Sequence, residues 1–294
     1  MRRLPVVALA AELAEKGPER DSPRMEDQRI GFIGAGNMAS ALLRGLLRAG
    51  RLTPEQIKLS DVDRAKRDDC ARSHGVSVAS SNRELAAWAS VLLLAVKPQS
   101  LPAVLAECAS SVPPGTLVLS IAAGVRCATL AAALPPGSRI VRAMPNAPAL
   151  VGAGATAVCA GPGATSADLE LARSLFDAVG RAVVVDETHM DAVTGLSGSG
   201  PAYVMLIIEA LADGGVRTGL SRETALLLAT QTVLGSAQLL LESGEHPAVW
   251  KDRVMSPGGT TAAGLAALEA GRLRSTLARA VEHATRRARE LGNR

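Results

Sequence analysis

Aromatic residues are scarce in this chain of 294 residues, at 2% of the composition. Two Trp, one Tyr and two Phe are too few for the stacking surfaces that bind single-stranded nucleic acid. The net charge of +4 is small, and the arginines near the C-terminus are typical of a solvated helix face. The sequence therefore predicts no nucleic-acid partner. A hydrophobic content of 48% with so few rings indicates a core of aliphatic side chains.

Cysteine and histidine are also few, at four residues each, and neither type is clustered. Cys70, Cys108, Cys127 and Cys159 form no CxxC pair, so we expect reduced thiols rather than disulfides or zinc ligands. The histidines show neither HxH nor HxxxH spacing. The sequence predicts no metal site.

Long apolar runs are missing as well. None approaches the roughly 18 residues of a membrane helix, which predicts no membrane span. The N-terminal segment, residues 1–28, begins with two arginines and an apolar run that stops at Glu12, which is short for an export signal. Acidic residues such as Glu15 and Glu19 are atypical of a mitochondrial transit peptide. We expect residues 1–28 to be a disordered extension and the protein to be cytoplasmic, with a mitochondrial location as the alternative.

From Arg29 onwards, short apolar runs alternate with segments of helical periodicity. The apolar runs are continuous, which is typical of strands buried on both faces of a parallel sheet. Strands and helices that alternate at this spacing predict an open, doubly wound α/β domain over residues 29–186. The runs expected to form strands are RIGFIG, IKLSD, VLLLAV, TLVLSIAAG, RIVRAM, ATAVCA and RAVVVDE.

Residues 187–294 show helical periodicity and no convincing strand. Two long segments, PAYVMLIIEALADGGVRTG and RETALLLATQTVLGSAQLLLESG, are apolar on more than one face. A helix that is apolar on more than one face must be buried. One small bundle of helices cannot bury all the apolar surface of these segments. We therefore expect an all-α domain that packs against a second copy of the chain, giving at least a homodimer.

The segment Gly34–Ala39 has the pattern G-x-G-x-x-A, directly after the first expected strand and directly before a helix. In that context Gly34 permits a tight turn, Gly36 lets a pyrophosphate approach the backbone, and Ala39 lets helix and strand pack closely. The free N–H groups at the start of the helix attract phosphates. The sequence thus predicts a dinucleotide-binding domain of the Rossmann type.

The end of the second expected strand leaves the choice of dinucleotide open. Asp61 favours NAD, because a carboxylate there accepts a hydrogen bond from the ribose 2′-hydroxyl. Ser60 and the nearby Arg64, Lys66 and Arg67 favour NADP, because they suit a 2′-phosphate. The basic run tips the expectation toward NADP, with NAD also usable.

Two further glycine-rich segments fall in the helical region. Thr194–Tyr203, TGLSGSGPAY, is expected to be a loop before a helix. The segment SPGGTTAAGLAALEAG begins at Ser256, and Thr260 or Thr261 is expected to cap a helix that runs to about Ala270. Glycines and small hydroxyl residues at a helix start form nests of N–H donors, which suit a small carboxylate. Simple helix capping is the alternative interpretation of either loop.

Residues typical of hydroxy-acid dehydrogenases are missing. No His–Asp pair stands out for acid–base chemistry, and the helical region has one lysine, Lys251, outside any long apolar helix. Hydride addition to an imine needs less acid–base chemistry from the protein, because the imine nitrogen can be protonated before the substrate binds. The enzyme then mainly holds the donor and acceptor carbons together. Alternatives are another NAD(P)-dependent imine or hydroxy-acid oxidoreductase and a non-catalytic dinucleotide-sensing protein.

Eight segments, in order along the chain, resemble the pyrroline-5-carboxylate reductase family, which reduces 1-pyrroline-5-carboxylate to L-proline in the last step of proline synthesis. They are GFIGAGNMA, LAVKPQ, SIAAGV, RAMPN, GLSGSGPAY, EALADGGV, GEHP and SPGGTT. The resemblance covers Arg29 to about Asn293. It implies NADPH or NADH as the cofactor, and dimers with interlocked helical domains that commonly build larger rings, such as a decamer.

The resemblance also implies roles for individual residues. The pyrophosphate would lie on Gly34, Ala35, Gly36, Asn37, Met38 and Ala39, and the adenosine ribose near Ser60 and Asn82. Val96, Lys97 and Pro98 would line the cofactor cleft, and Ala122, Ala123, Gly124 and Asn146 would lie near the nicotinamide. The substrate carboxylate would bind Ser256, Gly258, Gly259, Thr260 and Thr261. Thr194 would orient the ring nitrogen, with Ser199 beside it, as the catalytic positions.

Overall fold

The computed structural model describes residues 25–292, which divide into two compact units. The helical unit comprises Ala202–Ala280, and the sheet unit comprises the described residues up to Pro201 together with those from Val281 onwards. This division differs from the expected boundary between residues 186 and 187. Residues 187–201 stay with the sheet unit, where Met190 is fully buried in the core, and the end of the last helix returns to it.

The sheet unit is built on eight strands in the order β3-β2-β1-β4-β5-β6-β7-β8. All neighbouring pairs are parallel except β6 and β7, which run antiparallel. The predicted doubly wound sheet is confirmed, with β7 and β8 reversed in direction and the short β3 added at the edge. The strands are β1 (Ile30–Ile33), β2 (Ile57–Ser60), β3 (Ser77–Val78), β4 (Val91–Leu94), β5 (Leu117–Ser120), β6 (Arg139–Met144), β7 (Gly154–Ala160) and β8 (Gly180–Val184).

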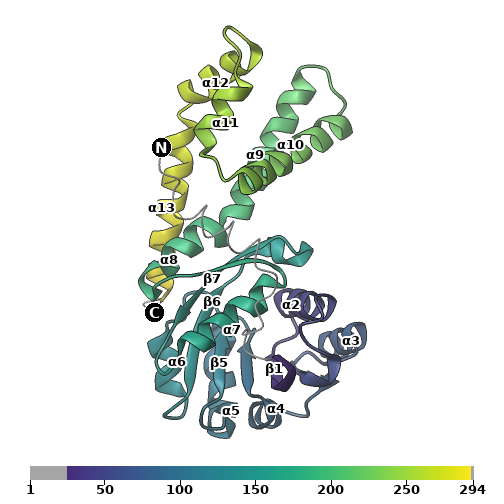
Figure 1. Ribbon diagram of the computed structural model, residues 1–294, viewed down its shortest axis with the longest axis vertical. Coiled ribbons are helices and arrows are strands. Elements are labelled where there is room, and N and C mark those ends of the chain that lie inside the picture. Colours follow the sequence, from purple (N-terminus) through teal and green to yellow (C-terminus); the bar gives the residue numbers. More distant parts are fainter. Residues whose placement is uncertain (1–24, 293–294) are drawn as a thin grey trace. The chain divides into compact units, whose positions relative to one another are not determined.

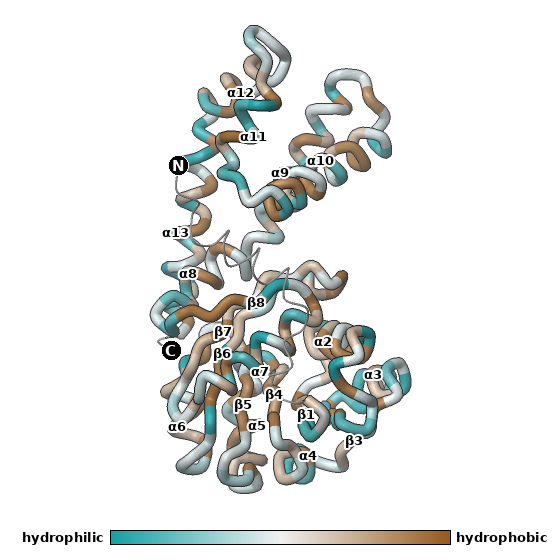
Figure 2. The backbone as a smooth tube through the Cα atoms, in the orientation of Figure 1, coloured by the Kyte–Doolittle hydropathy of each residue, from teal (hydrophilic) through white to brown (hydrophobic). Residues whose placement is uncertain are grey.

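Helices cover both faces of the sheet because the strands bury alternate side chains on either side (Figure 1). Phe32 and Leu93 pack on one face with α2, α3 and α7, while Leu92 and Leu94 pack on the other with α4, α5, α6 and α8. The central strands are accordingly the most apolar part of this unit (Figure 2). The helices of the sheet unit are α2 (Asn37–Arg48), α3 (Arg64–His74), α4 (Asn82–Trp88), α5 (Leu101–Cys108), α6 (Cys127–Ala133), α7 (Ser166–Asp177) and α8 (Met190–Val193).

Of the expected N-terminal extension, residues 1–28, the structure describes only residues 25–28. Residues 1–24 lie outside the described part of the chain. Met25–Asp27 form a 3-10 turn, and the side-chain amide of Gln56 donates to the carbonyl oxygens of Met25 at 2.6 Å and Gln28 at 3.1 Å. For residues 25–28 the prediction of disorder is therefore wrong, because the carbonyls of Met25 and Gln28 are hydrogen-bonded to Gln56, the residue before β2.

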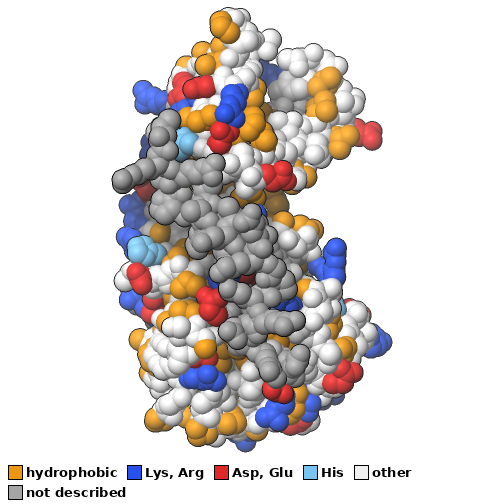
Figure 3. All heavy atoms as spheres, viewed as in Figure 1, with side chains coloured by type: hydrophobic (Ala, Val, Ile, Leu, Met, Phe, Trp, Pro, Cys, Tyr) orange, Lys and Arg blue, Asp and Glu red, His pale blue; other side chains and the backbone are white. Residues whose placement is uncertain are grey.

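The remaining helices are α9 (Gly200–Arg217), α10 (Arg222–Ser243), α11 (Pro247–Val254), α12 (Thr260–Ala270) and α13 (Leu273–Gly292). Within the helical unit, the buried apolar side chains of the described residues are three alanines, Ala212, Ala225 and Ala229. Large apolar side chains lie in the open instead, including Leu206 at 66% and Leu227 at 67% exposure. Hydrophobic side chains are accordingly visible on the surface of this unit (Figure 3).

Two helical segments, Glu187–Arg217 and Arg222–Ser243, are long and apolar enough to span a membrane by length and composition alone. In each, 11% of the most apolar window is buried within this one chain. No uninterrupted apolar run of that length occurs in the sequence, so the expectation of no membrane span stays a prediction. The sequence predicted helices here that are apolar on more than one face, and the structure confirms these helices. Most of their apolar side chains are not buried by other parts of the same chain. An exposed apolar surface of this extent is typical of an interaction site.

Candidate dinucleotide and substrate site

The glycine turn joins β1 to α2 at the carboxyl end of the sheet. Gly34 has φ +108°, and a Cβ there would lie 2.6 Å from the carbonyl oxygen of Ala95, so only glycine fits. Gly36 is the N-cap of α2 without a side-chain cap bond, and a Cβ on it would meet nothing within 4 Å. No side chain caps the first N–H groups of α2, and no acidic residue lies in its first turn. This is the geometry that a pyrophosphate requires, so the turn fits a dinucleotide.

Asp61, directly after β2, is hydrogen-bonded to this turn. Its two carboxylate oxygens accept hydrogen bonds of 2.8 Å from the backbone N–H groups of Ala35 and Asp63. The adjacent Ser60 carbonyl accepts a bond of 2.8 Å from the N–H of Gly34. The sequence left Asp61 open as an acceptor for a ribose 2′-hydroxyl, and in the structure its carboxylate holds the glycine turn.

Ser60 and Asn82, both expected near the adenosine ribose, are in contact. The Ser60 hydroxyl donates to Asn82 Oδ1 at 2.6 Å, and Asn82 Nδ2 donates to the carboxylate of Glu107 at 2.7 Å. Ser60 and Asn82 are 5% and 8% exposed, so little of either faces solvent. No local pattern pointed to Glu107, which lies in α5 and contacts Asn82 at the start of α4.

The next parallel strands end beside the glycine turn and carry the residues expected around the cofactor. Val96, Lys97 and Pro98 follow β4, with Lys97 exposed and the other two half-buried. Ala122, Ala123 and Gly124 follow β5, and Gly124 turns the chain with φ +76°. Because β1, β4 and β5 are neighbours in the sheet, the structure brings these segments to one edge. Ligands of doubly wound sheets bind at this edge.

Asn146, at the end of β6, is a connecting residue in the structure. Its amide nitrogen donates to the carbonyl of Ser197 at 3.0 Å, and its Oδ1 accepts from the N–H of Ala155 at 2.8 Å. The sequence expected Asn146 near the nicotinamide, and the structure adds that it ties the start of β7 to the segment that contains Thr194. The importance of Ser197 could not be read from the sequence, because it contributes a backbone carbonyl.

The expected loop at Thr194–Tyr203 is wrong: the chain is helical from Met190 to Arg217. Thr194–Gly198 form a π-helical turn, closed by a bond of 2.9 Å from the Ser199 N–H to the Thr194 carbonyl. Its glycines serve close packing, since a Cβ on Gly195 would lie 2.3 Å from Thr285 Oγ1. Because these N–H groups are used within the helix, they form no anion-binding nest. Single π-turns in α-helices are frequent at functional sites.

The Ser256–Thr261 segment keeps its predicted open helix start, with one correction. The cap of α12 is Gly259, not Thr260 or Thr261, which lie in the first helical turn. Gly258 adopts φ +67°, and the N–H of Gly259 bonds to the Ser256 carbonyl at 3.0 Å, which directs the chain into the helix. No side chain caps the helix and no acidic residue lies in its first turn. Its free N–H groups suit a carboxylate.

Cys127, Cys159 and Glu187 form a cluster of possible metal ligands, with their ligand atoms within 4.8 Å of one another. Glu187 also accepts from the Cys127 N–H at 2.7 Å and pairs at 3.4 Å with Arg142, whose side chain is 3% exposed. The bond to the Cys159 sulfur, together with burial, raises the pKa of Cys127. Burial raises the pKa of Glu187, but the Cys127 N–H and Arg142 outweigh it and the pKa is lowered. The positive charge of Arg142 thus balances the negative charge of the Glu187 carboxylate. The expectation from the sequence that the protein has no metal site stays a prediction.

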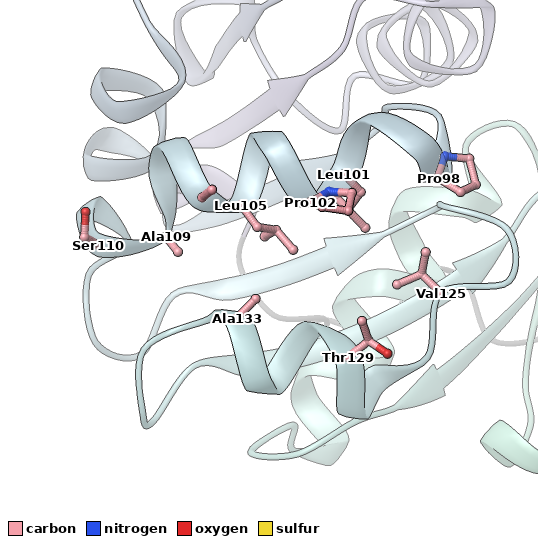
Figure 4. Close-up of a pocket in the computed structure, with 10 residues that line it drawn as sticks. Pro98, Leu101, Pro102, Leu105, Ala109, Ser110, Val125, Thr129 and Ala133 are labelled. Carbon is pink, nitrogen blue, oxygen red and sulfur yellow. The ribbon is translucent and has the colours of Figure 1, made fainter. Parts of the chain in front are cut away.

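A pocket of about 530 Å³ lies between α5 and α6 (Figure 4). Leu105 of α5 and Thr129 of α6 line it from opposite sides. Its lining is mostly apolar, and it shares only Pro98 with the predicted cofactor residues. The lining of the pocket therefore includes no residue of the glycine turn Gly34–Ala39.

Comparison with known proteins gives close relatives over most of the chain. A pyrroline-5-carboxylate reductase of Methanosarcina acetivorans is 48% identical over 268 residues, which cover 91% of this chain and 99% of the relative. The chain belongs to the pyrroline-5-carboxylate reductase family. Residues 187–291 match the family described as pyrroline-5-carboxylate reductase dimerisation, and residues 29–124 match NADP oxidoreductase coenzyme F420-dependent. The predicted resemblance is confirmed.

Solved structures of pyrroline-5-carboxylate reductases share this fold. The Coxiella burnetii protein superposes with a TM-score of 0.83 at 39% identity, covering 90% of this chain and 98% of its own. The Plasmodium falciparum protein, crystallised with NADP bound, has a TM-score of 0.79 at 34% identity, covering 91% and 99%. The chain is therefore an oxidoreductase that uses NAD(P)H, with a Rossmann-type sheet domain followed by a helical domain that matches the dimerisation family.

Proposed function

We propose that the protein reduces 1-pyrroline-5-carboxylate to L-proline with NADPH or NADH. Membership of the reductase family over about nine-tenths of the chain carries this proposal, and the 48% identical relative is part of its support. The uncapped glycine turn at Gly36 supports the dinucleotide, and the uncapped start of α12 supports an anionic substrate.

The residues that hold the cofactor lie in the sheet unit. Gly34–Ala39 bind the pyrophosphate through the first N–H groups of α2, and Ser60 with Asn82 lies at the adenosine ribose. Val96–Pro98 and Ala122–Gly124 line the path toward the nicotinamide. The bound reduced nicotinamide supplies the hydride of the reaction.

Thr194 orients the ring nitrogen of the substrate, with Ser199 beside it. In the structure the Thr194 hydroxyl donates its proton to the Met190 carbonyl at 2.9 Å, so its oxygen is left as an acceptor. An acceptor suits an imine nitrogen that arrives protonated and donates its N–H. Thr194 then acts by position and needs to transfer no proton. Ser256, Gly258, Gly259, Thr260 and Thr261 bind the carboxylate.

We further propose that the helical unit buries its apolar faces against a second copy of the chain. Three buried alanines cannot hold a unit of this size, while Leu206 and Leu227 are each about two-thirds exposed. The matched dimerisation family supports a homodimer. A larger ring, such as a decamer, is the natural extension of such a dimer.

Oxidation of NADPH and NADH at 340 nm with 1-pyrroline-5-carboxylate tests the reaction, and chromatography identifies proline as the product. We expect proline in step with cofactor oxidation. Faster oxidation of hydroxy acids would favour a hydroxy-acid oxidoreductase, and faster reduction of another cyclic imine would favour a different imine reductase. Cofactor binding without turnover of any of these compounds would favour a dinucleotide sensor.

A further inference from the structure

The π-helical turn Thr194–Gly198 contains a backbone carbonyl that cannot receive its regular helical hydrogen bond. In an α-helix, the N–H of each residue donates to the carbonyl four residues before it. The residue four positions after Ser197 is Pro201, which has no N–H. The Ser197 carbonyl therefore cannot receive the α-helical bond, although it lies next to the residue assigned to the substrate nitrogen, Thr194, in the same turn.

Asn146 supplies a donor to this carbonyl from the end of β6. Its Nδ2 donates to the Ser197 carbonyl at 3.0 Å, while its Oδ1 accepts from the N–H of Ala155 at 2.8 Å. Because a carbonyl only accepts and a backbone N–H only donates, a single orientation of the amide satisfies both partners. Asn146 is 8% exposed, so this orientation is held within the sheet unit.

Ser197 connects the tether to Thr194. The Ser197 hydroxyl donates to the carbonyl of Val193 at 3.1 Å, directly before Thr194. The Thr194 carbonyl in turn receives the N–H of Ser199 at 2.9 Å, which closes the turn. Since Ser197 lies between the residues that form these bonds, we expect a shift of its carbonyl to move Thr194.

The glycines of the turn allow close contact on two sides. A Cβ on Gly198 would lie 2.7 Å from Met144 Cε at the end of β6, and a Cβ on Gly195 would lie 2.3 Å from Thr285 Oγ1 on α13. The turn is thus packed directly against the strand that leads to Asn146. Packing sets the distance between the turn and β6, and the directed bond from Asn146 sets the position of the turn along it.

We infer that Asn146 is a positioning residue for the reduction: by donating to the carbonyl that Pro201 leaves without an α-helical donor, it holds the π-turn so that Thr194 faces the ring nitrogen of the substrate. The inference rests on the proposed function, which gives Thr194 that task. It assigns Asn146 to the substrate side of the site, whereas the sequence placed this residue with the cofactor.

Asn146→Ala tests the inference because it removes the donor without adding a charge. We expect kcat/KM for 1-pyrroline-5-carboxylate to fall by about tenfold or more, while the Kd for NADP⁺, measured by calorimetry, stays within about twofold of the wild type. Hydrogen–deuterium exchange reports on the turn without catalysis. It should become about tenfold faster for the Ser199 N–H.

Gln56→Ala is the matched control, because the Gln56 amide makes the same pair of bonds at the amino end of β2. Its Oε1 accepts from the N–H of Thr53 at 2.9 Å, and its Nε2 donates to the carbonyl of Met25 at 2.6 Å. This variant should lose stability in the same way, but kcat/KM and the exchange of Ser199 should not change.

An unchanged kcat/KM or an unchanged Ser199 exchange rate in folded Asn146→Ala overturns the inference, as does an equal loss of kcat/KM in Gln56→Ala. A rise in the Kd for NADP⁺ that matches the loss of kcat/KM also overturns it, because Asn146 would then contact the cofactor through its second Nδ2 proton.

If Asn146→Ala melts far below the wild type, Asn146→Asp replaces it, because it keeps the shape and the bond from Ala155 and removes the donor to Ser197. The same fall in kcat/KM and the same faster exchange are expected, and their absence overturns the inference. A wild type that forms no proline would instead overturn the proposed function, whatever the exchange rates.

Discussion

The carboxylate of Asp61 accepts a hydrogen bond of 2.8 Å from the backbone N–H of Ala35. This bond joins the end of β2 to the glycine turn and fixes the direction of the N–H groups that follow. A bond between a backbone donor and a charged acceptor contributes more than a neutral one, about 1.5–3 kcal/mol. Asp61 is therefore expected to act on the cofactor through the turn.

Replacing Asp61 with asparagine keeps one acceptor and removes the charge. We expect the Kd values of NAD⁺ and NADP⁺ both to rise by roughly tenfold, measured by calorimetry. Asp63→Asn is the control, since Asp63 caps α3 by accepting from the Lys66 N–H at 3.2 Å and asparagine is an equally good cap. Unchanged Kd values for both dinucleotides in Asp61→Asn would show that the glycine turn keeps its shape without the Asp61 charge.

Alanine at Gly34 and at Gly36 should separate stability from binding. At Gly34 the new Cβ would lie 2.6 Å from the Ala95 carbonyl at φ +108°, so we expect a loss of stability of about 2–4 kcal/mol. At Gly36 the Cβ meets nothing within 4 Å, so urea unfolding should change by less than about 0.5 kcal/mol. Gly36→Ala should nevertheless weaken dinucleotide binding at least about tenfold, because the pyrophosphate approaches there. Strong binding by Gly36→Ala would place the phosphates elsewhere.

Thr261→Val tests the carboxylate site at the start of α12. Valine keeps the shape and removes the hydroxyl, so the KM for 1-pyrroline-5-carboxylate should rise by about tenfold, while the KM for the cofactor changes little. Thr218→Val is the control, since that hydroxyl bonds only to the carbonyls of Gly214 and Gly215. An unchanged substrate KM would remove Thr261 from the site.

Glu187 should make stability depend on pH. Its pKa is lowered from 4.5, because the Cys127 N–H and Arg142 outweigh the opposing effect of burial. A lowered pKa in the folded state means that its stabilisation is present above about pH 4.5 and is lost as the pH falls through the folded value. Glu187→Gln should therefore lose about 2 kcal/mol at neutral pH, where it leaves the buried Arg142 unpaired. In urea unfolding, the gap to the wild type should narrow below about pH 4. If the difference in unfolding free energy between the two proteins stays the same at every pH, the loss of stability comes from packing and not from the charge of Glu187.

The exposed face of α10 should decide the oligomeric state. An aspartate at Leu227, which is 67% exposed, places a charge in the surface that we assign to the partner copy. We expect light scattering after size exclusion to show smaller particles or aggregates. Val151→Asp, at an 81% exposed apolar position of the sheet unit, is the control and should leave the assembly intact. Identical particles from both variants would argue for a different interface.

Local signals in the sequence specified much of this fold. The glycine turn located the start of α2 at Asn37, and the continuous apolar runs located the strands β1, β2, β4 and β5. The π-turn was missed because its glycines are explained by contacts distant in sequence, such as Gly195 with Thr285. The meeting of Asn82 with Glu107 was also beyond sequence reasoning, because it depends on two helices that follow different strands. Likewise, the cap of α12 depends on the left-handed turn at Gly258 rather than on a hydroxyl residue.

The chain leaves the sheet unit after Pro201 and comes back at Val281. A fragment that stops at Pro201 would lose Thr285 beside Gly195, and it would lose the end of α13 beside Gly124. We therefore expect that a free-standing nucleotide module needs residues 281–292 joined back through a linker. The helical unit, in contrast, is a single continuous insertion, so it can be exchanged between relatives as a cassette with two junctions.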